Sequence, residues 1–306
     1  MIRLLPLLLV FLVGCGNNIE SEPVPTSEAH QNFATTVEND LKTSVVIKQV
    51  ENTLWIYVPF EENLIELKST KDGPMKVKEV SSKPAINFLE ANFENNNFVI
   101  EYDIGTVRSY PKSFGYSSSY SQKFQALQQG LYMSLLNTFN DVYDDESYQA
   151  PEFVYIIIAD MKTGIEVNSL IYMDDLRHMM HAQEEFQKRV ISEVQGHEKI
   201  VGDRTGEHLD LTPITFPEFL AKQMAHRINF KYTRSTFPPS EDALKEIQMQ
   251  VKTTLELYNF KDFDNIIINN LENELSTEVT TSDLENIEME GRLITIDFSQ
   301  ESGQNP

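Results

Sequence analysis

The sequence predicts an α+β fold in which a mainly antiparallel sheet, built from hairpins, packs against about four helices. Its β-rich runs come in close pairs separated by short turn sequences, and apolar stripes at helical spacing lie between these pairs. Glycine is scarce, with 12 residues in 306. Doubly wound parallel sheets and phosphate-binding loops use glycine at their turns, so its scarcity weighs against both.

The chain begins with an apolar segment, MIRLLPLLLVFLVGC. Arg3 supplies a positive start, and residues 4–13 are apolar throughout, with one proline among them. A membrane-spanning helix needs roughly 20 apolar residues, whereas this run has the length of the apolar region of a signal peptide. The run ends at Cys15, which is the only cysteine of the chain.

The ending Leu-Val-Gly-Cys resembles the lipobox of bacterial lipoproteins. The resemblance implies that residues 1–14 are a lipoprotein signal peptide and that Cys15 carries lipid, with a diacylglycerol thioether and acyl chains such as palmitate. The protein would then be anchored to the cell membrane or outer membrane and would face outside the cytoplasm. Gly16, where aspartate marks inner-membrane retention in enteric-type bacteria, favours the outer membrane if the host has one. An ordinary secretory signal with a stray cysteine is the alternative.

Composition divides the remaining chain and limits its partners. Residues 15–42 are polar and contain proline, so we expect a flexible tether next to the lipid; residues 43–298 form the globular region, and residues 299–306 a loose tail. A division into two subdomains near residues 200–212 stays open. The net charge of −22 excludes nucleic acid as a partner. No cofactor is expected, and a lipid on Cys15 would leave no thiol for catalysis or zinc.

The first half of the globular region predicts three hairpins and a helix. Two β-rich runs, residues 44–50 and 53–59, flank a tight turn, and the second carries Trp55, which we expect to be buried. Further strand pairs are predicted at 86–93 with 96–104 and at 153–160 with 165–173, and the strand at 153–160 should be central because it is the most apolar. A helical stripe occupies residues 124–142.

The second half predicts mainly helices. One helix is expected over residues 174–194, a second begins with Thr215 as N-cap and Pro217 in the first turn, and a third follows Ser240. Short strands are predicted at 264–271 and 293–298. A polar loop at 196–211 separates the first two helices.

That loop is the first candidate for a functional site. It contains the densest group of chemically capable side chains in the chain, and its two glycines leave room for backbone amides to face a ligand. The candidate binding residues are His197, Asp203, Arg204, Glu207 and His208. A carboxylate with a raised pKa would mark acid–base chemistry here. The alternative is a plain connector whose side chains point separately into solvent.

Two further candidates carry less chemistry. Tyr116 and Tyr120 lie among serines, a composition typical of binding surfaces, although such a segment also fits a packed strand-to-helix loop. His178 and His181 lie three residues apart with carboxylates one turn away, which makes them weak candidates for a metal site. A charged, exposed helix face is the alternative, and no metal is expected.

These features favour a lipid-anchored extracytoplasmic envelope protein with a non-catalytic structural or partner-binding role. Its partners would be the membrane, through Cys15, and another envelope protein. The alternatives are a ligand-binding lipoprotein of a transport system and a hydrolase or metal enzyme using the loop at 197–210; the sequence carries no GxSxG, HExxH or P-loop motif. The stretches TLWIYVPFEE and FLAKQMAHRINFKYTRSTFPPSE resemble an uncharacterised family of bacterial lipoproteins, which implies no activity.

Overall fold

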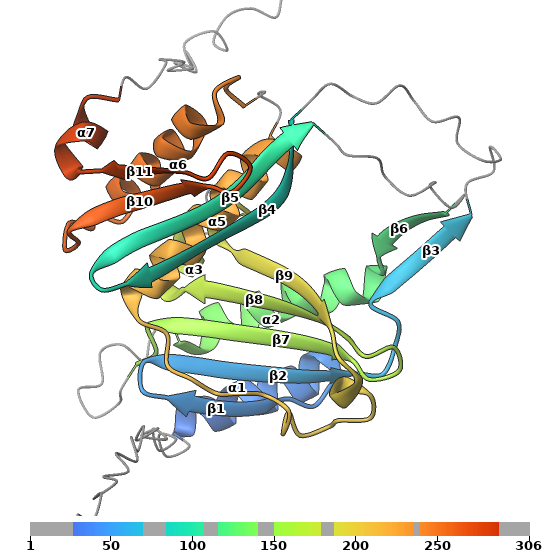
Figure 1. Ribbon diagram of the computed structural model, residues 1–306. Helices are drawn as coiled ribbons and strands as arrows, with labels where there is room; N and C mark the ends of the chain where they lie inside the picture. The colour runs from blue at the N-terminus through green and yellow to red at the C-terminus, as the bar shows by residue number, and fades with distance from the viewer. Residues whose placement is uncertain are drawn as a thin grey trace, which may run out of the picture.

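Two larger β-sheets, a two-stranded ribbon and the helices that cover the larger sheets form an α+β fold in the described residues, as the sequence predicts (Figure 1). The computed structural model describes residues 27–69, 84–106, 116–139, 150–178, 187–235 and 239–287. Within these residues the strand pairs are mostly antiparallel hairpins. The signal peptide with Cys15, the strand expected at 293–298 and the tail at 299–306 lie outside the described residues.

The first sheet has five strands in the order β1-β2-β7-β8-β9. Its strands are β1 (Val46–Val50), β2 (Thr53–Phe60), β7 (Phe153–Asp160), β8 (Ile165–Tyr172) and β9 (Ile191–Gly196). The hairpins β1–β2 and β7–β8 are those that the sequence predicts, and β7 is central as expected. The two hairpins join through a parallel pairing of β2 with β7, which local sequence patterns do not announce.

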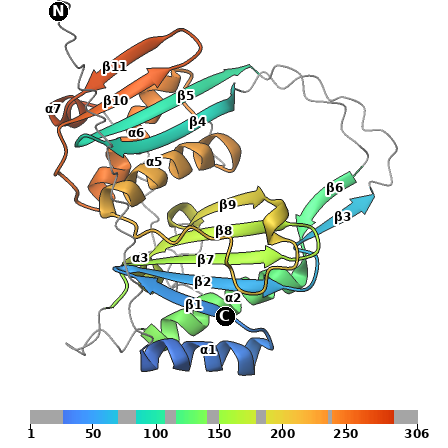
Figure 2. The ribbon, with the colours of Figure 1, turned by 60° about the horizontal axis from the view of Figure 1, so that its bottom comes forward.

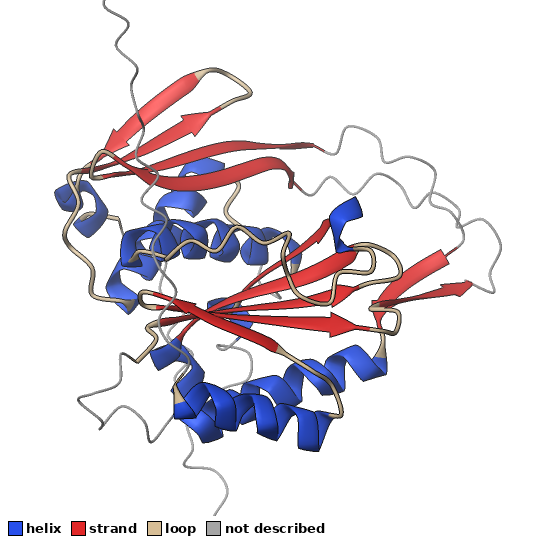
Figure 3. Cartoon of the chain, turned by 90° about the horizontal axis from the view of Figure 1, so that it is seen from below, coloured by secondary structure: helices blue, strands red, loops and turns tan. Residues whose placement is uncertain are grey.

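Two antiparallel helices cover one face of this sheet, α1 (Glu28–Leu41) and α2 (Gln122–Phe139) (Figure 3). The prediction of a flexible tether over residues 15–42 is therefore wrong for residues 28–41. Helix α1 begins with a capping box at Ser27 and buries Phe33 and Val37 completely. The polar composition hid this helix because only four of its 14 residues are buried, Ala29, His30, Phe33 and Val37.

The opposite face of the five-stranded sheet is aromatic and polar. Trp55 and Tyr155 face each other on neighbouring strands, with ring centroids 4.5 Å apart. Trp55 is 7% exposed, which confirms the expected burial. The connection from β9 to helix α5 (Phe216–Thr233) runs across this face, and Ile200, Leu209 and Leu211 pack on it.

The second sheet has four strands in the order β11-β10-β5-β4 and packs on helix α5 (Figure 2). Its elements are β4 (Pro84–Glu94), β5 (Asn97–Thr106), β10 (Asn265–Asn270), β11 (Leu275–Val279), α5 (Phe216–Thr233), α6 (Ala243–Leu257) and α7 (Thr281–Glu285). Helix α5 starts at the predicted Thr215 cap. Strand β11 was not predicted, and β10 pairs parallel to β5.

Apolar contacts join the two halves, because Phe153 and Leu170 of the first sheet share one core with α5 and the second sheet. Phe153 packs against Phe219 of α5 at 5.3 Å between ring centroids. The connection over residues 200–212 therefore links two packed layers.

The helix expected over residues 174–194 is wrong at its end. Helix α3 covers Met173–His178, and residues from Ile191 form β9, the edge strand beside β8. Val194 on this strand is 51% exposed. The β-branched residues at 191 and 194 suit a strand, and pairing with β8 outweighs the helical spacing.

The serine-rich segment before α2 is also a strand. Residues Tyr116–Tyr120 form β6, which pairs antiparallel with β3 (Ile65–Ser69). The expectation of a loop is therefore wrong here, because all five residues of this segment pair with β3 in a two-stranded ribbon.

Candidate functional site

The connection between β9 and α5, residues 197–214, is fixed to the first sheet along its length. At its start, the His197 N–H donates to the Gly164 carbonyl at 2.9 Å. In its middle, the Tyr57 hydroxyl donates to the Asp203 carbonyl at 2.8 Å. At its end, the Ile214 N–H donates to the Thr53 hydroxyl at 2.8 Å. We call residues 197–214 the covering loop, and its anchors make it a fixed wall of the site.

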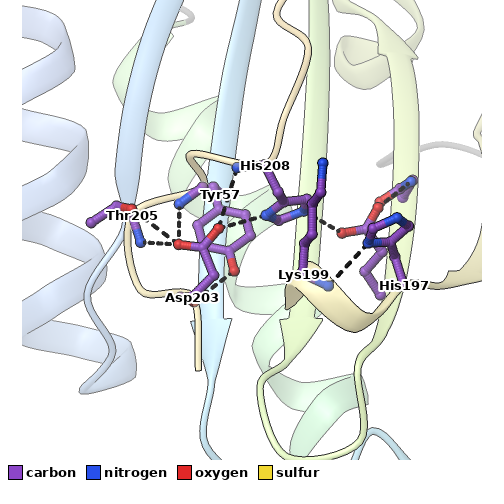
Figure 4. A network of polar contacts seen from close by, with 9 residues as sticks. Tyr57, His197, Lys199, Asp203, Thr205 and His208 are labelled. Carbon is purple, nitrogen blue, oxygen red and sulfur yellow. Dashed lines mark hydrogen bonds and ion pairs between the residues drawn. The ribbon is translucent and has the colours of Figure 1, made fainter. Parts of the chain in front are cut away.

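The Asp203 carboxylate organises the middle of the covering loop (Figure 4). Its Oδ1 atom accepts from the backbone N–H groups of Thr205 and Gly206, at 2.8 and 2.9 Å, and from the Thr205 hydroxyl at 3.0 Å. Its Oδ2 atom lies 2.6 Å from Nδ1 of His208. These contacts close the turn from residue 203 to 208 around one carboxylate.

His208 links this turn to the sheet. Its Nε2 atom lies 3.2 Å from a carboxylate oxygen of Glu166 on β8, while Nδ1 contacts Asp203. The imidazolium form can donate to both carboxylates at once, whereas the neutral ring can donate to only one. Glu166 is 4% exposed and also accepts from the Asn168 amide at 3.1 Å, so each of its two carboxylate oxygens has a polar partner.

The electrostatics of Asp203 are those of a structural acceptor. Burial alone would raise the pKa of its carboxyl, but the hydrogen bonds from His208, Thr205 and Gly206 outweigh burial and hold the pKa well below its usual range. A general acid at neutral pH needs the opposite shift. The raised carboxyl pKa that would mark acid–base chemistry is therefore not found at Asp203.

A pocket of about 320 Å³ lies between the covering loop and the sheet. Tyr155 and Ile157 supply an apolar part of its lining, and the other lining residues are mostly polar or charged. The described lining residues are Trp55, Tyr155, Ile157, Glu166, Asn168, Gln195, Gly196, His197, Lys199, His208, Leu209 and Asp210. Burial, with the negative charges of Glu193 and Glu166, raises the pKa of Tyr155 to about 12, so its hydroxyl keeps its proton.

Two polar atoms at this pocket have no partner within the described part of the chain. They are the indole N–H of Trp55 and the amide oxygen of Asn168, both buried from solvent. Trp55 is 7% and Asn168 is 3% exposed. Buried polar groups are normally hydrogen-bonded, and each exception calls for an explanation. One donor and one acceptor are thus left beside the same pocket.

The structure brings together only part of the predicted site. Asp203 and His208 are in contact, and His197 lines the pocket, where its Nδ1 atom accepts from the Lys199 N–H at 3.0 Å. Arg204 points away and pairs with Glu61. Glu207 is exposed and has no place in the pocket lining.

The other predicted residues lie elsewhere. Tyr116 and Tyr120 belong to β6, and Tyr120 packs on Phe124 with ring centroids 4.8 Å apart. His178 ends α3, while His181 lies outside the described residues. No group of three or more His, Cys, Asp or Glu side chains in the described ranges is placed to hold a metal ion.

Sequence reasoning missed the two polar residues that the sheet contributes. Glu166 and Asn168 lie two residues apart on β8, so both face the covering loop, while Val167 between them faces the helices. Polar residues at alternate positions of an otherwise buried strand were the available signal. Trp55 was expected in the core, and the structure adds that it borders a pocket.

No protein-family model, curated protein or solved structure matches the chain. None of the helices that the structure describes combines the length and apolar character needed to cross a membrane.

Proposed function

We propose that this protein is a non-catalytic binding protein of the cell envelope, anchored by lipid on Cys15, and that the pocket under the covering loop holds a small polar ligand. The observation that carries the pocket assignment is a pair of buried groups beside it that have no partner among the described residues, the Trp55 indole N–H and the Asn168 amide oxygen. Both atoms are covered from solvent, so a ligand with one acceptor and one donor would satisfy them once the neighbouring side chains shift to admit it.

The size and lining of the pocket support a small ligand. Ligand pockets range from about 300 to 1,000 Å³, and this one lies at the lower end of that range. The partly exposed ring of Tyr155 offers an apolar surface, and the side chains of Gln195 and Lys199 add further polar groups. Binding is favoured over catalysis because Asp203 and Glu166 are both held in fixed hydrogen bonds with His208.

Tryptophan fluorescence tests the pocket directly, because Trp55 is the only tryptophan in the chain. A panel of monosaccharides, amino acids and nucleosides is titrated against the full chain, with thermal unfolding as a second readout. At least one compound should change the Trp55 emission and raise Tm. In Asn168→Ala the response should weaken, whereas Asn39→Ala, at an exposed position of α1, should behave like the parent. If no compound changes either signal, the pocket assignment is wrong.

The anchor has its own test. The apolar run that ends in Leu-Val-Gly-Cys supports lipidation of Cys15. Replacing Cys15 with Ser should release the protein from the membrane fraction or leave an uncleaved precursor. Mass spectrometry that finds an unmodified mature Cys15 would contradict the anchor while leaving the pocket untouched.

A further inference from the structure

Two strand edges that are unpaired within the described part of the chain open onto one groove beside helix α5. Strand β4 is an edge of the four-stranded sheet, and β9 is an edge of the five-stranded sheet. Figures 1 and 2 place the two strands on opposite sides of α5. A groove of about 410 Å³ lies between them, lined by residues 86–92 of β4 and 191–193 of β9.

One face of α5 completes the groove. It contributes Lys222, Ala225, His226 and Asn229, whose spacing of three, one and three residues places them on the same side of the helix. Seven consecutive residues of β4 line the groove, and at about 3.3 Å per residue they span roughly 23 Å. A groove lined along this length of one strand suits an extended chain.

The strand edges carry backbone groups that an extended chain can pair with. Among the described residues, β4 pairs only with β5, and β9 pairs only with β8. No other backbone hydrogen bond joins residues 86–92 or 191–193 to a described segment. An edge of this kind can accept a peptide as an additional strand.

We propose that this groove binds an extended, basic segment of a partner protein, which pairs with the edge of β4. The partner segment pairs with the β4 residues that follow Asn87, because a bulge at Asn87 interrupts the β4–β5 register. Main-chain hydrogen bonds to β4 hold it, and its side chains contact β9 and α5.

Charge selects a basic partner. Among the lining residues, Glu90 and Glu193 are exposed carboxylates and Lys222 is the one lysine, while Arg227 and Arg234 lie near His226 but do not line the groove. Burial lowers the pKa of His226, and the nearby positive charges of Arg234 and Arg227 lower it further. The hydrogen bond to the Gln187 carbonyl raises the pKa but does not outweigh these causes, so the neutral ring is favoured at neutral pH. Lysine or arginine on the partner complements the two carboxylates.

The same charges disfavour a second copy of this chain as the occupant. Strand β4 reads PAINFLEANFE and carries Glu90 and Glu94 but no basic residue. A pair of β4 strands would collect four carboxylates on one short ladder, and like charges across a ladder are destabilising. A different chain with positive charge avoids this repulsion.

Selection from a display library of random twelve-residue peptides on the full chain in mild detergent tests the proposal. The enriched peptides should alternate apolar residues with lysine or arginine. When added, they should slow amide hydrogen exchange at residues 88–92, and N-methylation of alternate peptide amides should abolish binding. Glu90→Lys should weaken binding at least about tenfold, whereas Glu278→Lys, on the opposite edge of the same sheet, should change it less than about twofold.

Several results would overturn the proposal. They are a selection that enriches no peptide, protection confined to other residues, binding that survives N-methylation, and equal effects of the two lysine substitutions. Protection of residues 88–92 that grows with protein concentration in the absence of peptide would instead assign the groove to a second copy. None of these readouts involves Trp55, so they do not depend on the pocket under the covering loop.

Discussion

The Nδ1 atom of His208 lies 2.6 Å from the Asp203 carboxylate, and this contact closes a turn of the covering loop. The same imidazole reaches Glu166 on β8 through its other nitrogen. One side chain therefore fixes the shape of the loop and its position on the sheet. The pocket wall depends on both contacts, because His208 is itself a lining residue.

Replacing Asp203 with Asn should make the free energy of unfolding less dependent on pH in the acidic range. An aspartate whose pKa is lower in the folded chain than in the unfolded chain stabilises the fold above the usual aspartate value of about 3.9, and this contribution disappears as pH falls through the lowered value. At neutral pH Asp203→Asn should be less stable by about 1–3 kcal/mol. Urea unfolding should show the difference shrinking between about pH 5 and pH 2.

The control for Asp203 is Glu207→Gln, because Glu207 is an exposed carboxylate of the same loop. It should match the parent at every pH. A difference between parent and Asp203→Asn that stays constant down to about pH 2 would contradict the lowered pKa.

Two glycines of the covering loop allow backbone strain to be separated from steric contact. Gly202 and Gly206 both have positive φ, 78° and 68°. A Cβ at Gly206 would meet the Tyr57 ring at 3.0 Å, whereas a Cβ at Gly202 would meet nothing within 4 Å. Gly202→Ala should lower the free energy of unfolding by about 1 kcal/mol through backbone strain alone. Gly206→Ala should lower it by about 2–4 kcal/mol, because contact with the Tyr57 ring adds to the strain. Equal losses of unfolding free energy in the two variants would show that the ring of Tyr57 does not constrain the loop.

Helix α1 should contribute to the core and not act as a tether. Phe33 is fully buried between α2 and the sheet and contacts Phe139 with ring centroids 5.9 Å apart. Phe33→Ala should therefore lower the free energy of unfolding by about 3–5 kcal/mol. Thr35→Ala, at an exposed position of the same helix, should change it by less than about 0.5 kcal/mol. A small effect at Phe33, measured by urea unfolding, would restore the tether interpretation.

Trp55 should emit as a buried indole. It is 7% exposed and lies against Tyr155, Leu209 and Leu211. Its emission should be blue-shifted, and iodide should quench it much less in the folded chain than in urea. Trp55→Ala should lower the free energy of unfolding by about 3–5 kcal/mol, because the missing indole leaves a cavity and Tyr155 loses its stacking partner. Emission typical of water would show that the covering loop does not close over this residue.

The candidate site was only partly accessible from the sequence. The concentration of His, Asp and Gly over residues 197–210 singled out the covering loop, and the structure brings Asp203 and His208 of that loop together. Local composition could not show that Glu166 and Asn168 face the same pocket, because they belong to a strand about 40 residues earlier. Nor could it separate Arg204 and Glu207, which point elsewhere, from their neighbours.

The sequence by itself determined the features that depend on near neighbours. The β1–β2 and β4–β5 hairpins follow from strand-forming runs around tight turns, and the second turn uses Asn95 and Asn96 at positive φ. The start of α5 follows from Thr215, whose hydroxyl and Glu218 form a capping box. These interactions span only a few residues, so the local pattern is enough to specify them.

Only the tertiary structure decided the features that depend on distant partners. The pairing of β2 with β7 joins segments about 100 residues apart, and the polar run before residue 42 becomes a helix because α2 and the sheet bury Phe33 and Val37. Residues 191–194 become a strand because the edge of β8 offers them backbone hydrogen bonds. In each case the free energy comes from contacts between distant segments, and these outweigh the local preference of the chain.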